Sequence, residues 1–235
     1  MPYVGFVRPT YKSYALSDLV RLLPEDVGVI PLYAGIREHT PDGYMEAFPR
    51  YGELVGELAK IGCDVIHPEG APPFLIQGYA KEQEILKDWQ ARYKTPMFTS
   101  CSSAVESFNA LGKKRIVGVN FHAGPINDVF AKYFRDAGLD FLAMEGSDLD
   151  VGQSRELTMP ELQAHVKQAF KKHPTAEAVY LLGSGNWRPK DVLPLEADLG
   201  VPVLHPVQAR AYCILTRLGM KSPIKGAGRL LEAMP

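Results

Sequence analysis

The hydrophobic positions of this chain form short apolar runs that end at Gly, Pro, Ser or His, and these runs alternate with longer segments of helical spacing. Apolar runs of this length between helix-like segments are typical of buried parallel strands. The first half predicts strands at 4–9, 27–34, 63–70 and 97–99, and helices at 14–23, 40–62, 79–93 and 102–111. The second half predicts strands at 115–121, 140–144, 178–182 and 202–205, and helices at 125–137, 159–172, 189–199 and 207–218.

The two halves repeat the same order of elements. The run Val4–Pro9 is matched by Ile116–Phe121, and Pro96–Ser100 is matched by Pro202–Pro206. A repeat of about half the chain indicates a duplicated α/β unit. We therefore expect a first unit at 1–112 and a second at 113–207, with the segment 208–235 packing back on the first.

Composition narrows the class of partner. The 235 residues carry 26 Lys plus Arg against 27 Asp plus Glu, so a net charge of -1 gives no reason to expect binding to nucleic acid or an anionic membrane. No apolar run approaches the roughly 20 residues that cross a bilayer, so we expect no membrane span and a cytoplasmic protein. Its three cysteines have neither disulfide-framework nor zinc-site spacing. A small-molecule partner is the expectation that remains.

Functional groups should lie in the loops that follow the strands, because open α/β sheets bind ligands beyond the carboxyl ends of their strands. These loops are rich in hydroxyls and small residues, and where they open helices they offer unpaired backbone N–H groups to a carboxylate or phosphate. The loops in question are 9–13, 69–73, 99–102, 120–124, 183–187 and 205–208.

A family resemblance rests on short motifs in a fixed order. Thr99-Ser100 opens a helix, Leu111-Gly112 precedes a strand, Asn127 lies in a loop, and Leu199-Gly200 is followed by Gln208-Ala209. In this order the motifs resemble the aspartate/glutamate racemase superfamily, and most closely its arylmalonate decarboxylase and maleate cis-trans isomerase branch. The resemblance implies two pseudo-symmetric flavodoxin-like units, each a four-stranded parallel sheet flanked by helices. It also implies an active site in the cleft between the units, no cofactor, a small carboxylate as substrate, and self-association.

The chain departs from that family at its cysteines. The racemases place a cysteine after the third strand of each half, and the decarboxylase keeps only the second. Here the corresponding positions are Gly70 and either Gly183 or Ser184, so both thiols are missing. The thiols that a two-thiol proton shuttle or a cysteine adduct would need are therefore absent from these positions.

Three residues are candidates for catalysis. His122 falls near the family's loop tyrosine and has the ordinary imidazole pKa suited to proton transfer, although a histidine that bonds a loop carbonyl is the alternative. Glu69 precedes the first vacated cysteine position and is a candidate base or cation ligand, or equally a salt-bridged loop residue. Ser184 is a candidate oxyanion donor or nucleophile, without a recognisable Ser-His-Asp order.

Other strand-end residues are candidates for binding the substrate. Cys101, in a loop that opens a helix, is either a stabilised thiolate or a buried core residue. Arg188 is a further candidate partner for a substrate carboxylate, and we expect no metal site. The predicted binding residues are Pro9, Thr10, Lys12, Gly70, Ala71, Thr99, Ser100, Asn120, Gly183, Gly185, Asn186 and Gln208.

Together these features predict a cofactor-independent enzyme that acts on a small carboxylic or dicarbonyl acid through an enolate-like intermediate. Decarboxylation or another lyase reaction is favoured. An isomerase or hydrolase that uses Glu69 and His122 is one alternative, and a protein that binds carboxylates without catalysis is another.

Overall fold

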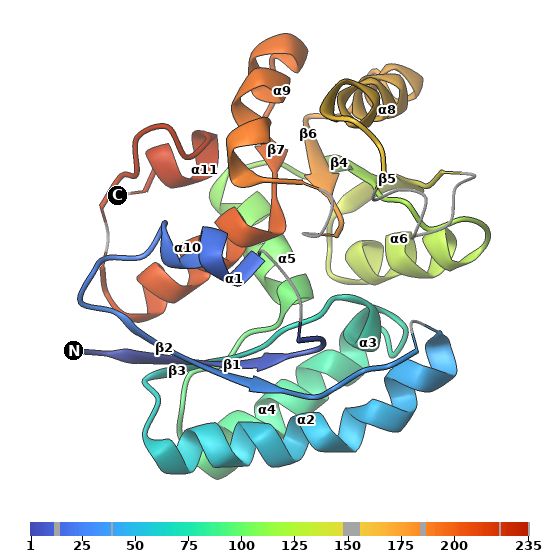
Figure 1. Ribbon diagram of the computed structural model, residues 1–235. Helices are drawn as coiled ribbons and strands as arrows, with labels where there is room; N and C mark the ends of the chain where they lie inside the picture. Colours follow the sequence, from blue (N-terminus) through green and yellow to red (C-terminus); the bar gives the residue numbers. More distant parts are fainter. Residues whose placement is uncertain (12–14, 39, 148–155, 184–186, 221, 235) are drawn as a thin grey trace.

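The computed structural model describes residues 1–11, 15–38, 40–147, 156–183, 187–220 and 222–234 (Figure 1). Its first half contains strands β1 (Tyr3–Arg8), β2 (Gly28–Tyr33) and β3 (Val65–Pro68), with helices α1 (Ala15–Val20), α2 (Pro41–Ile61), α3 (Pro72–Leu75), α4 (Tyr79–Tyr93) and α5 (Ser100–Ala110). Its second half contains strands β4 (Arg115–Val119), β5 (Asp140–Glu145), β6 (Ala178–Leu181) and β7 (Val203–Leu204). The helices of that half are α6 (Ile126–Asp136), α8 (Met159–Lys172), the 3-10 turn Pro189–Asp191, α9 (Val192–Leu199), α10 (Pro206–Arg217) and α11 (Arg229–Glu232).

The strands form two parallel sheets, and the order of the three strands of the first sheet is repeated within the second. The first has the order β2-β1-β3 and the second the order β5-β4-β6-β7. Val4 pairs with Val29 on one side and Val65 on the other, and Ile116 is placed likewise between Phe141 and Ala178. The α/β class and the repeat predicted from the sequence are confirmed.

The fourth strand predicted for the first sheet is reduced to one bridge, between Ile66 and Met97. The Pro96 carbonyl accepts from the Ile66 amide, but Pro96 has no N–H to donate, and Thr99 already serves as the N-cap of α5, so the pairing cannot extend beyond these residues. The first sheet therefore has three regular strands.

Local capping signals set the limits of α2. The Thr40 side chain accepts a hydrogen bond from the Gly43 amide, Pro41 occupies the first turn, and Gly62 ends the helix with φ 90°. Each of these residue types suits its position, because a hydroxyl satisfies a free N–H and glycine adopts the left-handed cap without a Cβ clash. The helix coincides with the one predicted.

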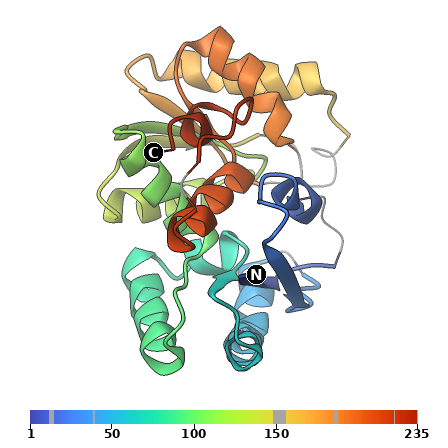
Figure 2. The same cartoon turned by 90° about the vertical axis from the view of Figure 1, so that its left-hand side faces the viewer.

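The C-terminal part of the chain packs on the first sheet. Val4 and Phe6 of β1 form one hydrophobic cluster with Leu19 of α1 and with Val207 and Ile214 of α10. Figure 1 shows α10 and α1 on one face of the first sheet and α2 and α4 on the other, and Figure 2 shows the same neighbours from the side. The two halves thus share apolar core.

No helix among the described residues is both long and apolar enough to cross a membrane.

Candidate active site

The ends of β1 and β3 bring three buried charges together. Arg8 is the last residue of β1, Glu69 directly follows β3, and Arg210 lies in the first half of α10. The Glu69 carboxylate is 2.7 Å from Arg210 Nη1 and 3.4 Å from Arg8 Nε, and all three side chains are buried. Each carboxylate oxygen is therefore held by a guanidinium, and proton transfer by Glu69 would require one of these ion pairs to open.

The turn after Glu69 depends on a glycine. Gly70 has φ +110°, and a Cβ there would lie 3.1 Å from the Tyr51 hydroxyl and close to the Pro9 ring. The Tyr51 hydroxyl donates to the Glu69 carbonyl at 2.8 Å, and the Gly70 amide donates to Ser100 Oγ at 3.1 Å. The structure thus brings the predicted binding residues Pro9, Gly70 and Ser100 into one place.

Two buried histidines border this region. His67 Nδ1 is 2.8 Å from the Phe98 carbonyl, which can only accept, so this nitrogen carries the proton. Burial and then the Arg210 charge hold the pKa of His67 well below its ordinary value. Burial and Arg210 also lower the pKa of His205 to about 3, and its Nε2 bonds the Trp187 carbonyl at 3.1 Å. Both imidazoles are neutral at pH 7.

In the second unit, a network of amides fixes the loop that carries His122. The His122 amide donates to Asn120 Oδ1 at 2.9 Å, and Asn127 Nδ2 donates to the His122 carbonyl at 2.8 Å. Asn120 Nδ2 donates to Asn127 Oδ1 at 2.8 Å, which closes the network. The half-buried His122 ring packs edge-on against Phe130 of α6. The side chain of the predicted binder Asn120 is thus engaged in the loop, and the His122 backbone is anchored.

A buried carboxyl that the sequence analysis did not single out joins the two units. Glu82 of α4 accepts hydrogen bonds from the hydroxyls of Thr99, at the start of α5, and Tyr133 of α6. Burial raises the pKa of Glu82 to about 7, against the opposing effect of these donors. Glu82 shares the buried face of α4 with Leu86 and Trp89, and this helical spacing was the available signal. Thr99 also caps α5 through its hydroxyl.

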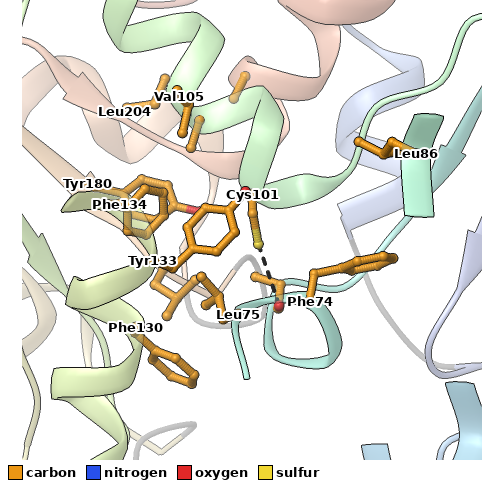
Figure 3. Packing of buried hydrophobic residues seen from close by; sticks show 14 of the residues in the cluster. Phe74, Leu75, Leu86, Cys101, Val105, Phe130, Tyr133, Phe134, Tyr180 and Leu204 are labelled. Carbon is orange, nitrogen blue, oxygen red and sulfur yellow. Dashed lines mark hydrogen bonds between the residues drawn. The ribbon is translucent and has the colours of Figure 1, made fainter. Parts of the chain in front are cut away.

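All three cysteines are buried. The Cys101 thiol lies 3.5 Å from the Ala71 carbonyl and points into a cluster with Tyr133 and Tyr180 (Figure 3). Burial, with Glu82 next in effect, raises the pKa of Cys101 well above that of a free thiol, and burial also raises the pKa of Cys63 and Cys213. These positions favour neutral, structural thiols over a catalytic thiolate.

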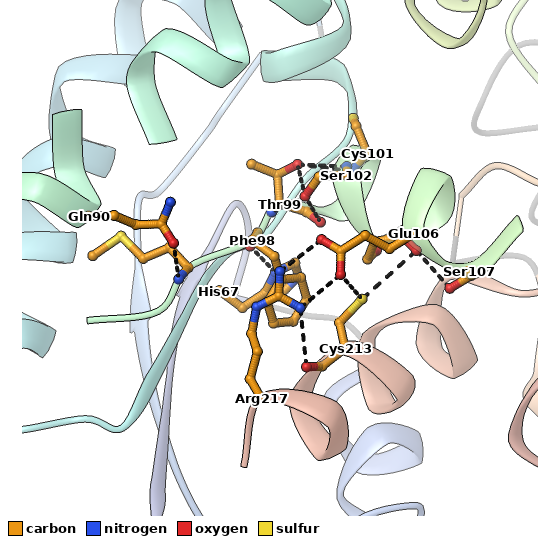
Figure 4. Close-up of polar contacts among 12 residues, drawn as sticks. His67, Gln90, Phe98, Thr99, Cys101, Ser102, Glu106, Ser107, Cys213 and Arg217 are labelled. Atoms are coloured by element: carbon orange, nitrogen blue, oxygen red, sulfur yellow. Dashed lines mark hydrogen bonds and ion pairs between the residues drawn. The ribbon is translucent and has the colours of Figure 1, made fainter. Parts of the chain in front are cut away.

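A second polar cluster ties α5 to α10. Glu106 bonds Arg217 through both carboxylate oxygens, at 2.8 and 2.9 Å, and Arg217 lies over the Phe98 ring (Figure 4). The Cys213 thiol is 3.5 Å from the same carboxylate. The charge of this guanidinium is therefore paired with the Glu106 carboxylate.

Two other predicted residues have structural partners. Gln208 Nε2 donates to the Ala227 carbonyl at 2.5 Å and Gln208 Oε1 accepts from the His205 amide at 3.1 Å, so its amide fastens the C-terminal loop. Arg188 binds Asp18 of α1 with distances of 2.5 and 2.6 Å. The Arg188–Asp18 ion pair joins the loop after β6 to the first unit.

The remaining predicted residues lie at the strand ends or outside the described part of the chain. Thr10 is half-buried after β1, and Gly183 is exposed after β6, with φ +98° and open space around its Cβ position. Lys12, Ser184, Gly185 and Asn186 lie outside the described residues. Among the residues that the structure covers, no group of three or more His, Cys, Asp or Glu side chains could hold a metal ion.

Solved structures share this fold over nearly the full chain. A maleate isomerase from Pseudomonas putida, solved as a cysteine-to-alanine variant with maleate, superposes with a TM-score of 0.88 at 17% identity and covers 98% of this chain and 97% of its own. A liganded glycine-to-cysteine, cysteine-to-serine double mutant of arylmalonate decarboxylase also gives 0.88, at 20% identity, with 99% of both chains covered. The fold is therefore that of two related enzymes, a decarboxylase and an isomerase.

The sequence identifies the family. The model of the arylmalonate decarboxylase family matches residues 5–231, and the chain belongs to this family. The maleate isomerase of Nocardia farcinica is 23% identical over 251 residues, covering 97% of this chain and 95% of the isomerase. That of Geobacillus stearothermophilus is 24% identical over 186 residues, covering 75% and 72%. The protein is thus an enzyme of a family that comprises lyases and isomerases acting on small carboxylates.

Proposed function

We propose that the protein is a lyase that decarboxylates a small carboxylic or dicarbonyl acid through an enolate-like intermediate, without a catalytic thiol. The observation that carries this proposal is the burial of every cysteine in the chain, at 4% exposure for Cys63 and 0% for Cys101 and Cys213. Each of the three also has a raised pKa. No thiolate is therefore available to attack a substrate.

The burial of the cysteines is our reason for proposing decarboxylation rather than isomerisation. A cysteine-to-serine variant of the Nocardia farcinica maleate isomerase was solved with a covalently bound succinylcysteine intermediate. In this chain such an adduct has no nucleophile. Decarboxylation needs none, because the electron pair of the breaking C–C bond passes into the retained carboxyl group, where hydrogen-bond donors and positive charge stabilise it.

Proton delivery to the carbanion is assigned to His122. It is half-buried and follows β4, its backbone is fixed by Asn120 and Asn127, and its ring packs against Phe130. Glu69 is better suited to hold Arg8 and Arg210 than to exchange protons, because both of its oxygens are in ion pairs. Thr10, Ser100, Gly70 and the loop 183–186 are proposed to contact the substrate.

The test is a panel of substituted malonates, with maleate as the isomerase substrate, followed by NMR and by CO2 release. We expect CO2 from at least one malonate, no fumarate from maleate, and full activity in a variant with all three cysteines changed to Ala. His122→Ala should lower kcat by about 100-fold or more, the contribution usual for a general acid, whereas the control His173→Ala should leave it unchanged. Fumarate formation, or loss of activity on removal of the cysteines, would refute the proposal.

A further inference from the structure

Glu82 is a buried carboxyl without a cationic partner among the described residues. Its side chain is 0% exposed, and the groups that bond it are three neutral donors, the side chains of Thr99, Tyr133 and Gln83. Burying a carboxylate without a cation is costly, whereas a neutral carboxyl that keeps its hydrogen bonds costs far less. The folded protein therefore favours the protonated form of Glu82.

The elements packed around Glu82 offer it no positive charge. The titratable groups that face it are Tyr133 of α6, Cys101 in the first turn of α5 and Tyr79, one turn earlier on α4. Tyrosine and cysteine side chains are uncharged near neutral pH. Arg210 acts on the pKa of Cys101 but is not among the influences on Glu82. Helix α3 carries no titratable side chain, and the charged residues of α2 are exposed.

The hydrogen bonds of Glu82 join the two units. Thr99 begins α5, at the end of the first unit, whereas Tyr133 lies in α6 of the second unit. The rings of Tyr79 and Tyr133 also meet edge to face, with their centroids 5.7 Å apart. Helices α4 and α6 thus meet at Glu82, so the charge of this one carboxyl acts directly on a contact between the units.

We propose that the protonated Glu82 carboxyl is a latch that holds α4 against α6, and that its ionisation at alkaline pH opens this contact and exposes the residues buried behind it. The only chemical change is the loss of one proton to solvent. Thr99 directly precedes Ser100, whose hydroxyl accepts from the Gly70 amide, so the latch adjoins a strand-end loop. The inference goes beyond the proposed function and does not depend on it.

The size of the effect follows from the two environments of the carboxyl. In the open state a solvated Glu82 has its ordinary pKa of 4.5, whereas burial raises the pKa to about 7 in the closed state. The closed state is therefore most favoured below pH 4.5 and loses this advantage as the pH rises through 7. The equilibrium constant for opening should increase by about tenfold between pH 6 and pH 9.

Cys101 reports on this contact from inside the protein. It is 0% exposed and shares a hydrophobic cluster with Tyr133 (Figure 3), so a reagent reaches its thiol only when the contact opens. Cys213 is the matched control, since it is equally buried but lies between α5 and α10, beside Glu106. The native protein is incubated with 4,4′-dithiodipyridine from pH 6 to 9, and the slow labelling of each cysteine is followed by peptide mass spectrometry.

The quantity measured is the labelling rate of Cys101 divided by that of Cys213, because the pH dependence of thiol chemistry is common to both. This ratio should rise by about tenfold between pH 6 and 9 in the unaltered protein and in Glu84→Gln, and should change by less than about twofold in Glu82→Gln. The comparison within the unaltered protein needs no variant, so it stands even if Glu82→Gln fails to fold.

Three results would overturn the inference. They are a ratio that does not change with pH because both cysteines become reactive together, a Cys101 that stays unlabelled at pH 9, and an equal rise of the ratio in Glu82→Gln. Release of CO2 from a malonate tests the proposed function alone, so the latch and the proposed reaction can fail separately.

Discussion

Replacing Glu82 by Gln should change how the stability of the protein depends on pH. Burial raises the pKa of Glu82 from its ordinary 4.5 to about 7 in the folded protein. Because the pKa is higher in the folded than in the unfolded protein, the folded state binds the proton more tightly. Ionisation of Glu82 therefore lowers the free energy of unfolding. The penalty is absent below the unfolded pKa, grows between pH 4.5 and 7, and is complete above pH 7.

The magnitude follows from the two pKa values. The difference between 7 and 4.5 is about 2.5, which corresponds to about 3 kcal/mol at about 1.4 kcal/mol per pKa unit. Gln keeps the shape of the side chain and never ionises. The hydroxyls of Thr99 and Tyr133 both donate to the carboxylate, and one of them must turn to accept from the new NH2 group, at a cost of about 1 kcal/mol. Glu82→Gln should therefore be slightly destabilising at pH 5 and stabilising by about 2 kcal/mol at pH 9.

The assay is urea unfolding of both proteins at several pH values from 5 to 9. The quantity of interest is the free energy of unfolding of the variant minus that of the unaltered protein, because all other titrating groups cancel in it. Glu84→Gln is the matched control, since Glu84 lies on the same helix but is exposed and paired with Lys81. A Glu82→Gln difference that varies by less than about 0.5 kcal/mol over this pH range would show that the pKa of Glu82 is not raised by burial.

Three further results are expected. Gly70→Ala should lower the free energy of unfolding by about 1–3 kcal/mol, because alanine is strained at φ +110° and its Cβ meets the Tyr51 hydroxyl at 3.1 Å. Urea unfolding of Tyr51→Phe, with and without Gly70→Ala, separates the backbone strain from the clash with the hydroxyl. An unchanged unfolding midpoint in Gly70→Ala would contradict both effects. Thr40→Ala should cost about 1 kcal/mol through loss of the cap on the Gly43 amide, and a fully retained unfolding free energy would argue against that cap. All three cysteines are buried, so a thiol reagent that releases a chromophore should label none in the native protein and three after denaturation. Rapid labelling under native conditions would show that at least one cysteine lies at the surface.

The strands and most helices could be predicted because their signals are local. Apolar runs with terminal Gly or Pro marked the buried strands, and Thr40, Pro41 and Gly62 marked α2. The short helix α3 was not predicted, because Pro72 and Pro73 read as loop residues although proline suits a first helical turn. The fourth strand of the first sheet was overestimated, because its three predicted residues, 97–99, form a single bridge before α5 begins at Ser100.

The site was harder to predict because its decisive contacts join distant parts of the chain. Glu69 could be singled out from its place after β3, but its partner Arg210 lies 141 residues further on and falls within an ordinary helix. Glu82 and Tyr133 are 51 residues apart, and only the position of Glu82 on an apolar helix face hinted at its burial. Sequence spacing identifies which strand end a residue occupies, whereas the identity of its charge partner depends on how the two units pack.

The packing of α10 on β1 has a consequence for how the chain is made. Phe6 leaves the ribosome about 200 residues before Val207 and Ile214, which cover it. At about 5–20 residues per second, the interval between them is on the order of 10–40 s. During that time the apolar face of the first strand lacks its permanent cover, so nascent chains should be a target for chaperones. A ribosome that stalls before α10 should release an aggregation-prone fragment rather than an independent half-enzyme.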